Sequence, residues 1–78
     1  MTLEEIKPLI DAQFIYEGEL KESTRIIEDL GADSFDIPVL LNALEDHFNL
    51  IISTEEMIGL RTLGDLISLL ENHLEGEK

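Results

Sequence analysis

The chain has 78 residues, 44% of them hydrophobic, and no cysteine. This length gives a single domain, residues 1–78, whose core is too small for a deep catalytic cleft. The lack of cysteine removes disulfides, thiolate metal sites and a cysteine nucleophile. The net charge of −13 repels nucleic acid, anionic membranes and other copies of the chain, which favours a monomer and partners with basic patches. The same acids would also serve merely to keep a small domain in solution, so charge alone assigns no function.

The N-terminal segment MTLEEIKPLI carries acids where a signal peptide has an uninterrupted apolar stretch. The longest apolar runs, such as IPVLL at 37–41, are too short to span a bilayer. We therefore expect a cytoplasmic protein without membrane insertion.

A first amphipathic helix is predicted from about residue 3, where Thr2 and Glu5 have the spacing of a capping box. Pro8 either bends this helix or marks the start of its regular part. The inward face of this helix is predicted to hold Leu3, Ile6, Leu9, Ile10 and Phe14. Residues 17–33 show no sustained period and are expected to form a long connection. Three apolar residues are expected to anchor that connection in the core: Ile26, Ile27 and Leu30.

A central helix is predicted over 34–48 from apolar residues at helical spacing. These residues are Ile37, Leu40, Leu41, Leu44 and Phe48. Ser53 and Glu56 have capping-box spacing for a short third helix, and Thr62 with Asp65 repeats it for a last helix. The inward face of the last helix is predicted to hold Leu63, Leu66, Ile67, Leu70 and Leu74. The pattern predicts an all-α fold with a long loop between helices 1 and 2 and a short third helix.

The stretch LGADSFD at 30–36 places one serine between two aspartates, where the connection gives way to the central helix. Asp33 is the expected N-cap, and Asp36 is expected to reach back from the third helical position. Ser34 is then the first helical residue, and its hydroxyl is not needed for capping. It would point to solvent at the positive end of the helix dipole, where a phosphate ester is favoured. An ordinary first-turn serine is the commoner case for such a stretch, so capping alone does not decide its role.

Catalysis by Ser34 itself would need a base within about 3 Å. His47 lies thirteen residues further along the same helix, roughly 20 Å away at 1.5 Å per residue. His73 is flanked by acids and is expected to be a solvated surface residue. A hydrolase is therefore disfavoured. The aspartates near Ser34 do not follow the ligand order of a calcium loop, so no specific metal site is predicted.

The stretch IIEDLGADSFDIPVLLNALEDHF at 26–48 resembles the acyl carrier protein family. The resemblance continues through an apolar residue at 52, acids at 55 and 56 and the Thr62-Leu63 start of the last helix, and it runs without a gap from about Ile26 to Leu70. The Asp-Ser-Leu-Asp motif of the family stands here as Asp33-Ser34-Phe35-Asp36. The resemblance implies a single acyl carrier domain with a four-helix bundle of acyl-carrier type, and a carrier rather than an enzyme.

The resemblance further implies that a phosphopantetheinyl transferase attaches 4′-phosphopantetheine from coenzyme A to Ser34, within a motif completed by Asp33, Phe35 and Asp36. Acyl groups would ride on the arm as thioesters in a fatty acid, polyketide or specialised acyl-transfer pathway. The partners would be acyltransferases, ketosynthases or acyl ligases with basic docking patches. The implied docking residues are Asp36, Val39, Asn42, Glu45, Asp46, Glu55 and Glu56. The implied acyl-pocket residues, each equally consistent with plain core packing, are Leu40, Leu44, Phe48, Ile52, Ile58 and Leu66.

Two positions depart from the family pattern near Ser34. Val39 replaces a glutamate that usually contacts basic partners, and with Phe35 and Ala43 it forms an exposed apolar stripe that indicates a dedicated pathway. Pro38 cannot donate to the carbonyl of Ser34, so the start of the central helix should be loosened. Two rival interpretations are a peptidyl or aminoacyl carrier, which typically has GG-x-S where this chain has GADS, and an acidic interaction module that is never modified.

Overall fold

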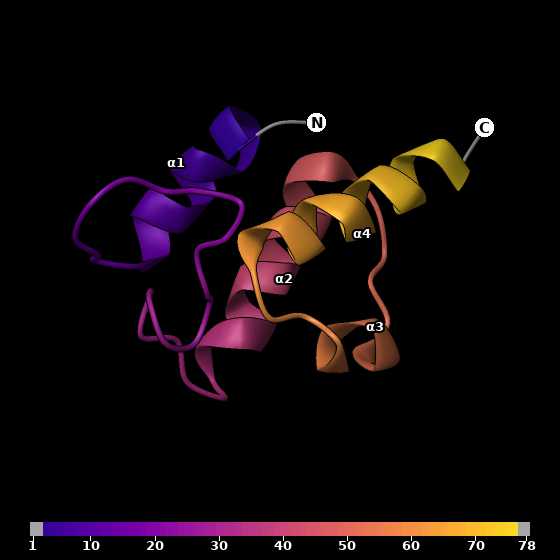
Figure 1. Cartoon of the computed structure of the whole chain (residues 1–78). Coiled ribbons are helices and arrows are strands. Elements are labelled where there is room, and N and C mark those ends of the chain that lie inside the picture. Colours follow the sequence, from indigo (N-terminus) through magenta and orange to yellow (C-terminus); the bar gives the residue numbers. More distant parts are fainter. Residues whose placement is uncertain (1–2, 77–78) are drawn as a thin grey trace.

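The computed structural model describes residues 3–76, and within them the regular structure is helical (Figure 1). The helices are α1 (Leu3–Gln13), α2 (Asp36–Phe48), α3 (Thr54–Ile58) and α4 (Leu63–Gly76). Helix α3 has only five residues, whereas the others have 11 to 14. In Figure 1, α2 lies in the middle of the molecule, between α1 and α3. The predicted all-α class is confirmed, as are the long connection before α2 and the short third helix.

One hydrophobic core joins the three longer helices and the long connection. Its most deeply buried side chains are Ile6 and Ile10 of α1, Ile26 of the connection, Leu40 and Leu44 of α2, and Leu63, Leu66 and Leu70 of α4. Burying a side chain of this kind stabilises the fold by about 1.5–3 kcal/mol. The core therefore fixes how α2, which begins two residues after Ser34, sits against α1 and α4.

The helical periodicity predicted which faces are buried, with one error at the end of α4. Leu74 was predicted to face inward, but its side chain is 37% exposed. The reason lies in the arrangement of Figure 1, where the C-terminal end of α4 extends beyond the body of the molecule.

Helix α1 runs without interruption through Pro8. The alternative in which the regular part begins only at Pro8 is therefore wrong. Pro8 lacks the N–H that would donate to the carbonyl of Glu4, and the buried Ile6 and Ile10 on either side hold the helix together. Thr2 of the predicted capping box lies outside the described residues.

The long connection is fastened to the start of α4 by a short backbone ladder between residues 22–26 and 61–64. Arg25 and Thr62 form an isolated antiparallel bridge. The accompanying hydrogen bonds run from Ile26 N to Arg61 O (2.9 Å), from Leu63 N to Thr24 O (3.0 Å) and from Gly64 N to Glu22 O (2.8 Å). We call this contact the loop–helix ladder.

Two of the three predicted anchors of the connection are in the core. Ile26 and Leu30 are buried, whereas Ile27 is 57% exposed, so its prediction is wrong. Residues 26–30 form consecutive turns, in which adjacent side chains point in different directions. With Ile26 directed into the core, Ile27 is left outside.

Substitution of Gly64 tests the loop–helix ladder. A Cβ at Gly64 would lie 3.1 Å from the carbonyl oxygen of Glu22, the same oxygen that accepts the Gly64 N–H. Alanine normally stabilises a helix relative to glycine, but here the backbone must shift to make room. We expect Gly64→Ala to lower the free energy of unfolding by about 1 kcal/mol, measured by urea denaturation followed by circular dichroism.

Gly59→Ala is the matched control, because a Cβ at Gly59 meets nothing within 4 Å. It should leave stability unchanged or raise it. A Gly64→Ala protein as stable as the Gly59→Ala protein would show that the ladder tolerates displacement.

Candidate functional site

Residues 33–36 form a hydrogen-bonded turn in which two aspartates cap each other's backbone. Asp33 Oδ1 accepts from the N–H groups of Phe35 (2.8 Å) and Asp36 (3.0 Å). Asp36 Oδ2 accepts from the N–H of Asp33 at 3.0 Å. The predicted pairing of these two acids is confirmed, and it fixes the backbone on both sides of Ser34.

The regular part of α2 begins at Asp36, two residues later than the predicted start at residue 34. The N-cap is Phe35 and the first helical residue is Asp36, so the predicted places of Asp33 as N-cap, Ser34 as first and Asp36 as third helical residue are wrong. Ser34 and Phe35 belong to the turn before the helix. Pro38 explains the shift, because it has no N–H to donate to the Ser34 carbonyl, and the first regular turn must start beyond that gap. The loosened start expected from Pro38 is therefore observed.

The Ser34 side chain is exposed, and its hydroxyl takes part in none of the hydrogen bonds among residues 3–76, in contrast to its aspartate neighbours. It lies at the N-terminal end of a 13-residue helix, where the partial positive charge of the backbone favours an attached anion. The site therefore presents a free primary alcohol on a fixed backbone.

Gln13, at the end of α1, also holds the site in place. Its Nε2 donates to the backbone carbonyl of Asp36 at 2.7 Å. This contact ties the first residue of α2 to α1. No sequence pattern indicates this contact, because a polar residue at the end of an amphipathic helix is ordinary and the contact spans 23 positions.

The two histidines lie in different surroundings. His47 is exposed near the end of α2, opposite to the Ser34 end, with its ring edge-on to Phe48 at a centroid distance of 4.8 Å. His73 is half-buried, and its Nε2 lies 2.6 Å from Glu56 Oε2. The expectation that His73 is a solvated surface residue is therefore wrong, because α3 brings Glu56 against α4.

Three of the acids predicted to dock partners bind this chain's own groups instead. Glu45 Oε2 accepts from the N–H of Ile52 at 2.7 Å, which holds the segment before α3. Glu56 accepts from the N–H of Ser53 at 3.3 Å in the predicted capping box, and it also pairs with His73. The third is Asp36, described above. The other polar members of the predicted set are exposed: Asn42, Asp46 and Glu55.

The apolar stripe predicted beside Ser34 is present at two of its three positions. Phe35 is 80% exposed and Val39 is 58% exposed, whereas Ala43 is partly buried. Large apolar side chains exposed next to one another commonly mark a contact surface. Here they stand one helical turn apart, directly after the free hydroxyl of Ser34.

The predicted acyl-pocket residues divide into an interior group and one outlier. Leu40, Leu44 and Leu66 are buried in the core. Phe48 and Ile52 pack against that core and are partly buried. Ile58 is 81% exposed at the end of α3. It therefore does not lie in the interior with the other residues implied for the acyl pocket. Helix α3 is too short to bury residues on more than one face.

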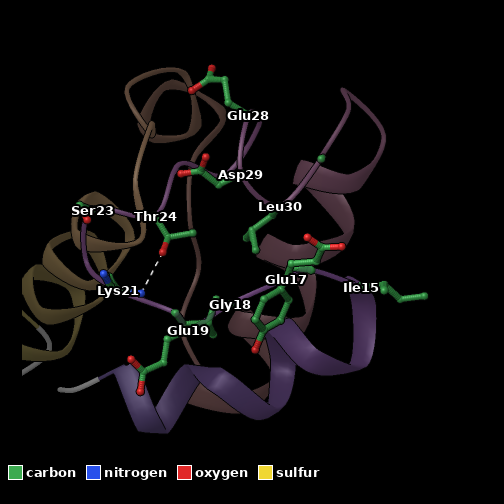
Figure 2. A pocket seen from close by; sticks show the side chains of 13 residues that line it. Ile15, Glu17, Gly18, Glu19, Lys21, Ser23, Thr24, Glu28, Asp29 and Leu30 are labelled. Carbon is green, nitrogen blue, oxygen red and sulfur yellow. Dashed lines mark hydrogen bonds between the residues drawn. The ribbon is translucent and has the colours of Figure 1, made fainter.

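A surface hollow of about 840 Å³ lies within the long connection (Figure 2). It is lined by residues between Ile15 and Gly31, with Thr24 Oγ1 accepting the N–H of Lys21 at 2.8 Å. The acidic side chains drawn in Figure 2, among them Glu19 and Glu28, are spread over its rim and do not converge. Ser34 is not among the lining residues, so this hollow is separate from the candidate site.

Within the part of the chain that the structure describes, no three His, Asp or Glu side chains are grouped so as to hold a metal ion. The helices of that part are also too short or too polar to cross a membrane.

Comparison with known proteins connects this geometry to a family. Residues 15–70 match the model of the phosphopantetheine attachment site. The acyl carrier protein of Wolinella succinogenes is 38% identical over 71 residues, covering 90% of this chain and 93% of the relative. The acyl carrier protein of a Sulfurovum species is 36% identical over 70 residues, covering 88% of this chain and 93% of the relative.

Solved structures of similar chains have the same arrangement. An acyl carrier protein from Thermotoga maritima superimposes with a TM-score of 0.81 at 29% identity, covering 96% of this chain and 92% of that one. A putative acyl carrier protein from Mycobacterium tuberculosis gives a TM-score of 0.77 at 28% identity, covering 83% and 88%.

The contact between α3 and α4 predicts a pH-dependent contribution to stability. The hydrogen bond from His73 holds the pKa of Glu56 below its ordinary value of 4.5. A carboxyl group with a lowered pKa in the folded state stabilises the fold above its unfolded-state pKa, and it loses that contribution as the pH falls through the folded-state value. Glu56→Gln should therefore lower the urea midpoint at neutral pH, and the deficit should shrink below pH 4.5.

Glu55→Gln is the matched control, because Glu55 is the exposed neighbour on the same short helix. Its urea midpoint should track that of the wild type at every pH. A Glu56→Gln deficit that stays constant between about pH 7 and pH 3 would mean that the carboxylate charge of Glu56 does not supply the stabilisation.

Proposed function

The chain belongs to the phosphopantetheine-attachment family and functions as an acyl carrier protein with covalent 4′-phosphopantetheine, and we propose that Ser34 is the residue that bears this group. The free hydroxyl of Ser34 is the observation that carries the proposal. The matched range 15–70 contains three other serines: Ser23, Ser53 and Ser68. Ser53 Oγ accepts the N–H of Glu56 as a helix cap, Ser68 lies within α4, and Ser23 lies in the long connection. Of these four serines, only Ser34 has an exposed hydroxyl next to the start of a long helix.

The surroundings of Ser34 fit a phosphodiester. The hydroxyl is exposed and has no partner among the described residues, and the end of α2 to which it is attached favours negative charge. The nearby carboxylates of Asp33 and Asp36 are held by backbone N–H groups. These bonds offset part of the repulsion that an added phosphate would meet.

Attachment requires chemistry that this chain does not supply. The Ser34 oxygen would attack a pyrophosphate phosphorus of coenzyme A, its proton would pass to a base, and adenosine 3′,5′-bisphosphate would leave. His47 is located near the opposite end of α2, and His73 is paired with Glu56. We therefore infer that the base belongs to a phosphopantetheinyl transferase and that this chain is its substrate. The thiol of the attached group supplies the thioester linkage for the acyl cargo.

The remaining features of the proposal follow from the fold and the charge. We infer one carrier domain over residues 1–78, a four-helix bundle of acyl-carrier type, and a monomer in the cytoplasm. The net charge of −13 supports partners with basic docking patches, such as acyltransferases, ketosynthases or acyl ligases, and disfavours nucleic acid. The buried Leu40, Leu44 and Leu66 are the proposed walls of an acyl site that would open between the helices, with Phe48 and Ile52 at its edge.

Intact-mass measurement tests the attachment site. After incubation with coenzyme A, magnesium and a broad-specificity phosphopantetheinyl transferase, the wild-type chain should gain the mass of one 4′-phosphopantetheinyl group. Ser34→Ala should gain none, because the accepting oxygen is removed. Ser68→Ala, which alters an exposed serine within α4, should be modified like the wild type. Modification of Ser34→Ala would refute the assignment, and an unmodified wild type would favour an acidic interaction module.

We propose further that the pathway is a dedicated one. Asp36, Glu45 and Glu56 bind groups of this chain, so their carboxylates are less available to a basic partner than free surface acids would be. Phe35 and Val39 are exposed instead. This combination supports recognition by the shape of an apolar surface more than by charge, and therefore a partner other than the housekeeping enzymes of fatty acid synthesis.

Val39→Glu tests this specialisation. We expect a housekeeping ketoacyl synthase to transfer acyl groups to or from the Val39→Glu carrier about tenfold faster than with the wild type, because the new carboxylate supplies a contact for basic residues. Ile51→Glu is the control, since it adds the same charge at a position that is 82% exposed and outside the stripe. Equal and full rates with the wild type and Val39→Glu would count against specialisation.

A further inference from the structure

The turn at 33–36 receives little support from the hydrophobic core. Its first three side chains, at 33–35, are exposed, and that of Asp36 is only half-buried. The nearest buried side chains in the sequence are Ala32, just before the turn, and Leu40, within α2. The segment that presents the free hydroxyl must therefore be held in place mainly by hydrogen bonds.

The hydrogen bonds within the turn join it only to itself and to the first residues of α2. Asp33 and Asp36 cap each other's backbone, and the Asp33 carbonyl accepts from the N–H groups of Asp36 (3.1 Å) and Ile37 (3.4 Å). Pro38 has no N–H, which removes the bond that would otherwise tie the carbonyl of Ser34 to the helix. These bonds set the shape of the turn but not its place against the rest of the molecule.

Gln13 supplies the one hydrogen bond, among those of residues 3–76, that joins the turn to a segment other than α2. Its Nε2 donates to the Asp36 carbonyl at 2.7 Å, and the bond is partly buried, so water competes for it less than for a surface bond. Gln13 is itself well fixed, because Ile10 and Phe14 beside it are buried and the Phe14 N–H donates to the Ile10 carbonyl at 2.8 Å.

We propose that Gln13 is a positioning residue for the modification of Ser34, an inference that rests on the proposed attachment. Its amide holds the carbonyl of Asp36, two residues beyond Ser34, and thereby keeps the exposed turn in the place where a phosphopantetheinyl transferase binds it. Gln13 takes no part in the chemistry. Its loss leaves the hydroxyl and both capping aspartates in the chain but lets the turn shift against α1.

The size of the effect follows from the fraction of molecules whose turn is in place. The apparent affinity of a site falls in proportion to the fraction that is competent to bind. One hydrogen bond between uncharged groups changes such a population about three- to fivefold. A turn that is bound in the right arrangement still reacts at the usual rate. Loss of the Gln13 bond should therefore raise the KM of the transferase for the apo chain and leave kcat unchanged.

Steady-state kinetics with a broad-specificity phosphopantetheinyl transferase and saturating coenzyme A test the proposal. Gln13→Leu and Gln13→Glu both lack the donor, but one is neutral and the other adds a charge. Each should raise the KM for the apo chain about three- to fivefold at unchanged kcat. Ala12→Glu is the charge control, because it adds the same charge at the exposed neighbouring residue of α1 and keeps the Gln13 amide. Its KM should be no higher than that of the wild type.

Ile67→Val is the stability control, because it removes one methylene group from the core at α4 and lowers stability without touching the turn. Its KM should equal that of the wild type. A wild-type KM in both Gln13 variants, a fall in kcat at unchanged KM, or an equal rise of KM in Ile67→Val would each overturn the positioning role. A wild-type chain that is not modified, or a Ser34→Ala chain that is, would instead refute the attachment itself.

Hydrogen exchange of side-chain amides tests the contact without any substitution. Gln13 is the one glutamine of the chain, so its side-chain NMR signals are readily assigned. Its amide protons should exchange with water several-fold more slowly than those of Asn72, whose side chain is exposed on α4. Equal exchange rates at Gln13 and Asn72 would show that the bond to Asp36 is not maintained in solution, and would overturn the proposal.

Discussion

The arrangement of the whole site depends on the loop–helix ladder between residues 22–26 and 61–64. Ordering each residue of an irregular segment costs roughly 1–2 kcal/mol of conformational entropy, and the long connection before α2 has few buried side chains to offset that cost, chiefly Ile26, Leu30 and Ala32. The ladder adds backbone hydrogen bonds to a helix whose own side chains are deep in the core. It thereby ties the loop that ends at Ser34 to the most firmly packed part of the molecule.

In the turn at 33–36, neighbouring residues have different roles. The two aspartates accept hydrogen bonds from the backbone N–H groups on both sides of Ser34, those of Asp33, Phe35 and Asp36, so the serine between them is left with no structural role. A hydroxyl acted on by another enzyme needs both properties, a fixed backbone and an uncommitted oxygen, because a hydrogen-bonded oxygen would have to break that bond before reacting. Pro38 contributes by delaying the regular helix, which leaves Ser34 in the turn.

The parts of this structure that could be predicted from sequence are those set by neighbours in the chain. The pairs Asp33–Asp36, Ser53–Glu56 and Thr62–Asp65 all form as their spacing indicates, because a capping interaction closes within one turn. The contacts of Gln13 with Asp36 and of His73 with Glu56 were not predictable, since each depends on how two helices approach. The errors at Ile27 and Leu74 have a related cause, because periodicity gives the direction of a side chain but not where the facing surface ends.

The distribution of charge suggests how such a chain distinguishes its partners. A surface potential this negative attracts any basic protein and so raises encounter rates without choosing between partners. Several of the acids proposed to distinguish between partners, Glu45 and Glu56 among them, accept hydrogen bonds within the fold. Under the proposed function, discrimination then falls to surface groups that are not acidic, among them Phe35 and Val39 beside the proposed attachment site and Arg61, which forms no ion pair of 4 Å or less among residues 3–76. A partner whose surface is uniformly basic would repel Arg61 and leave Phe35 against charged groups, so these residues would act against the wrong partner as well as for the right one.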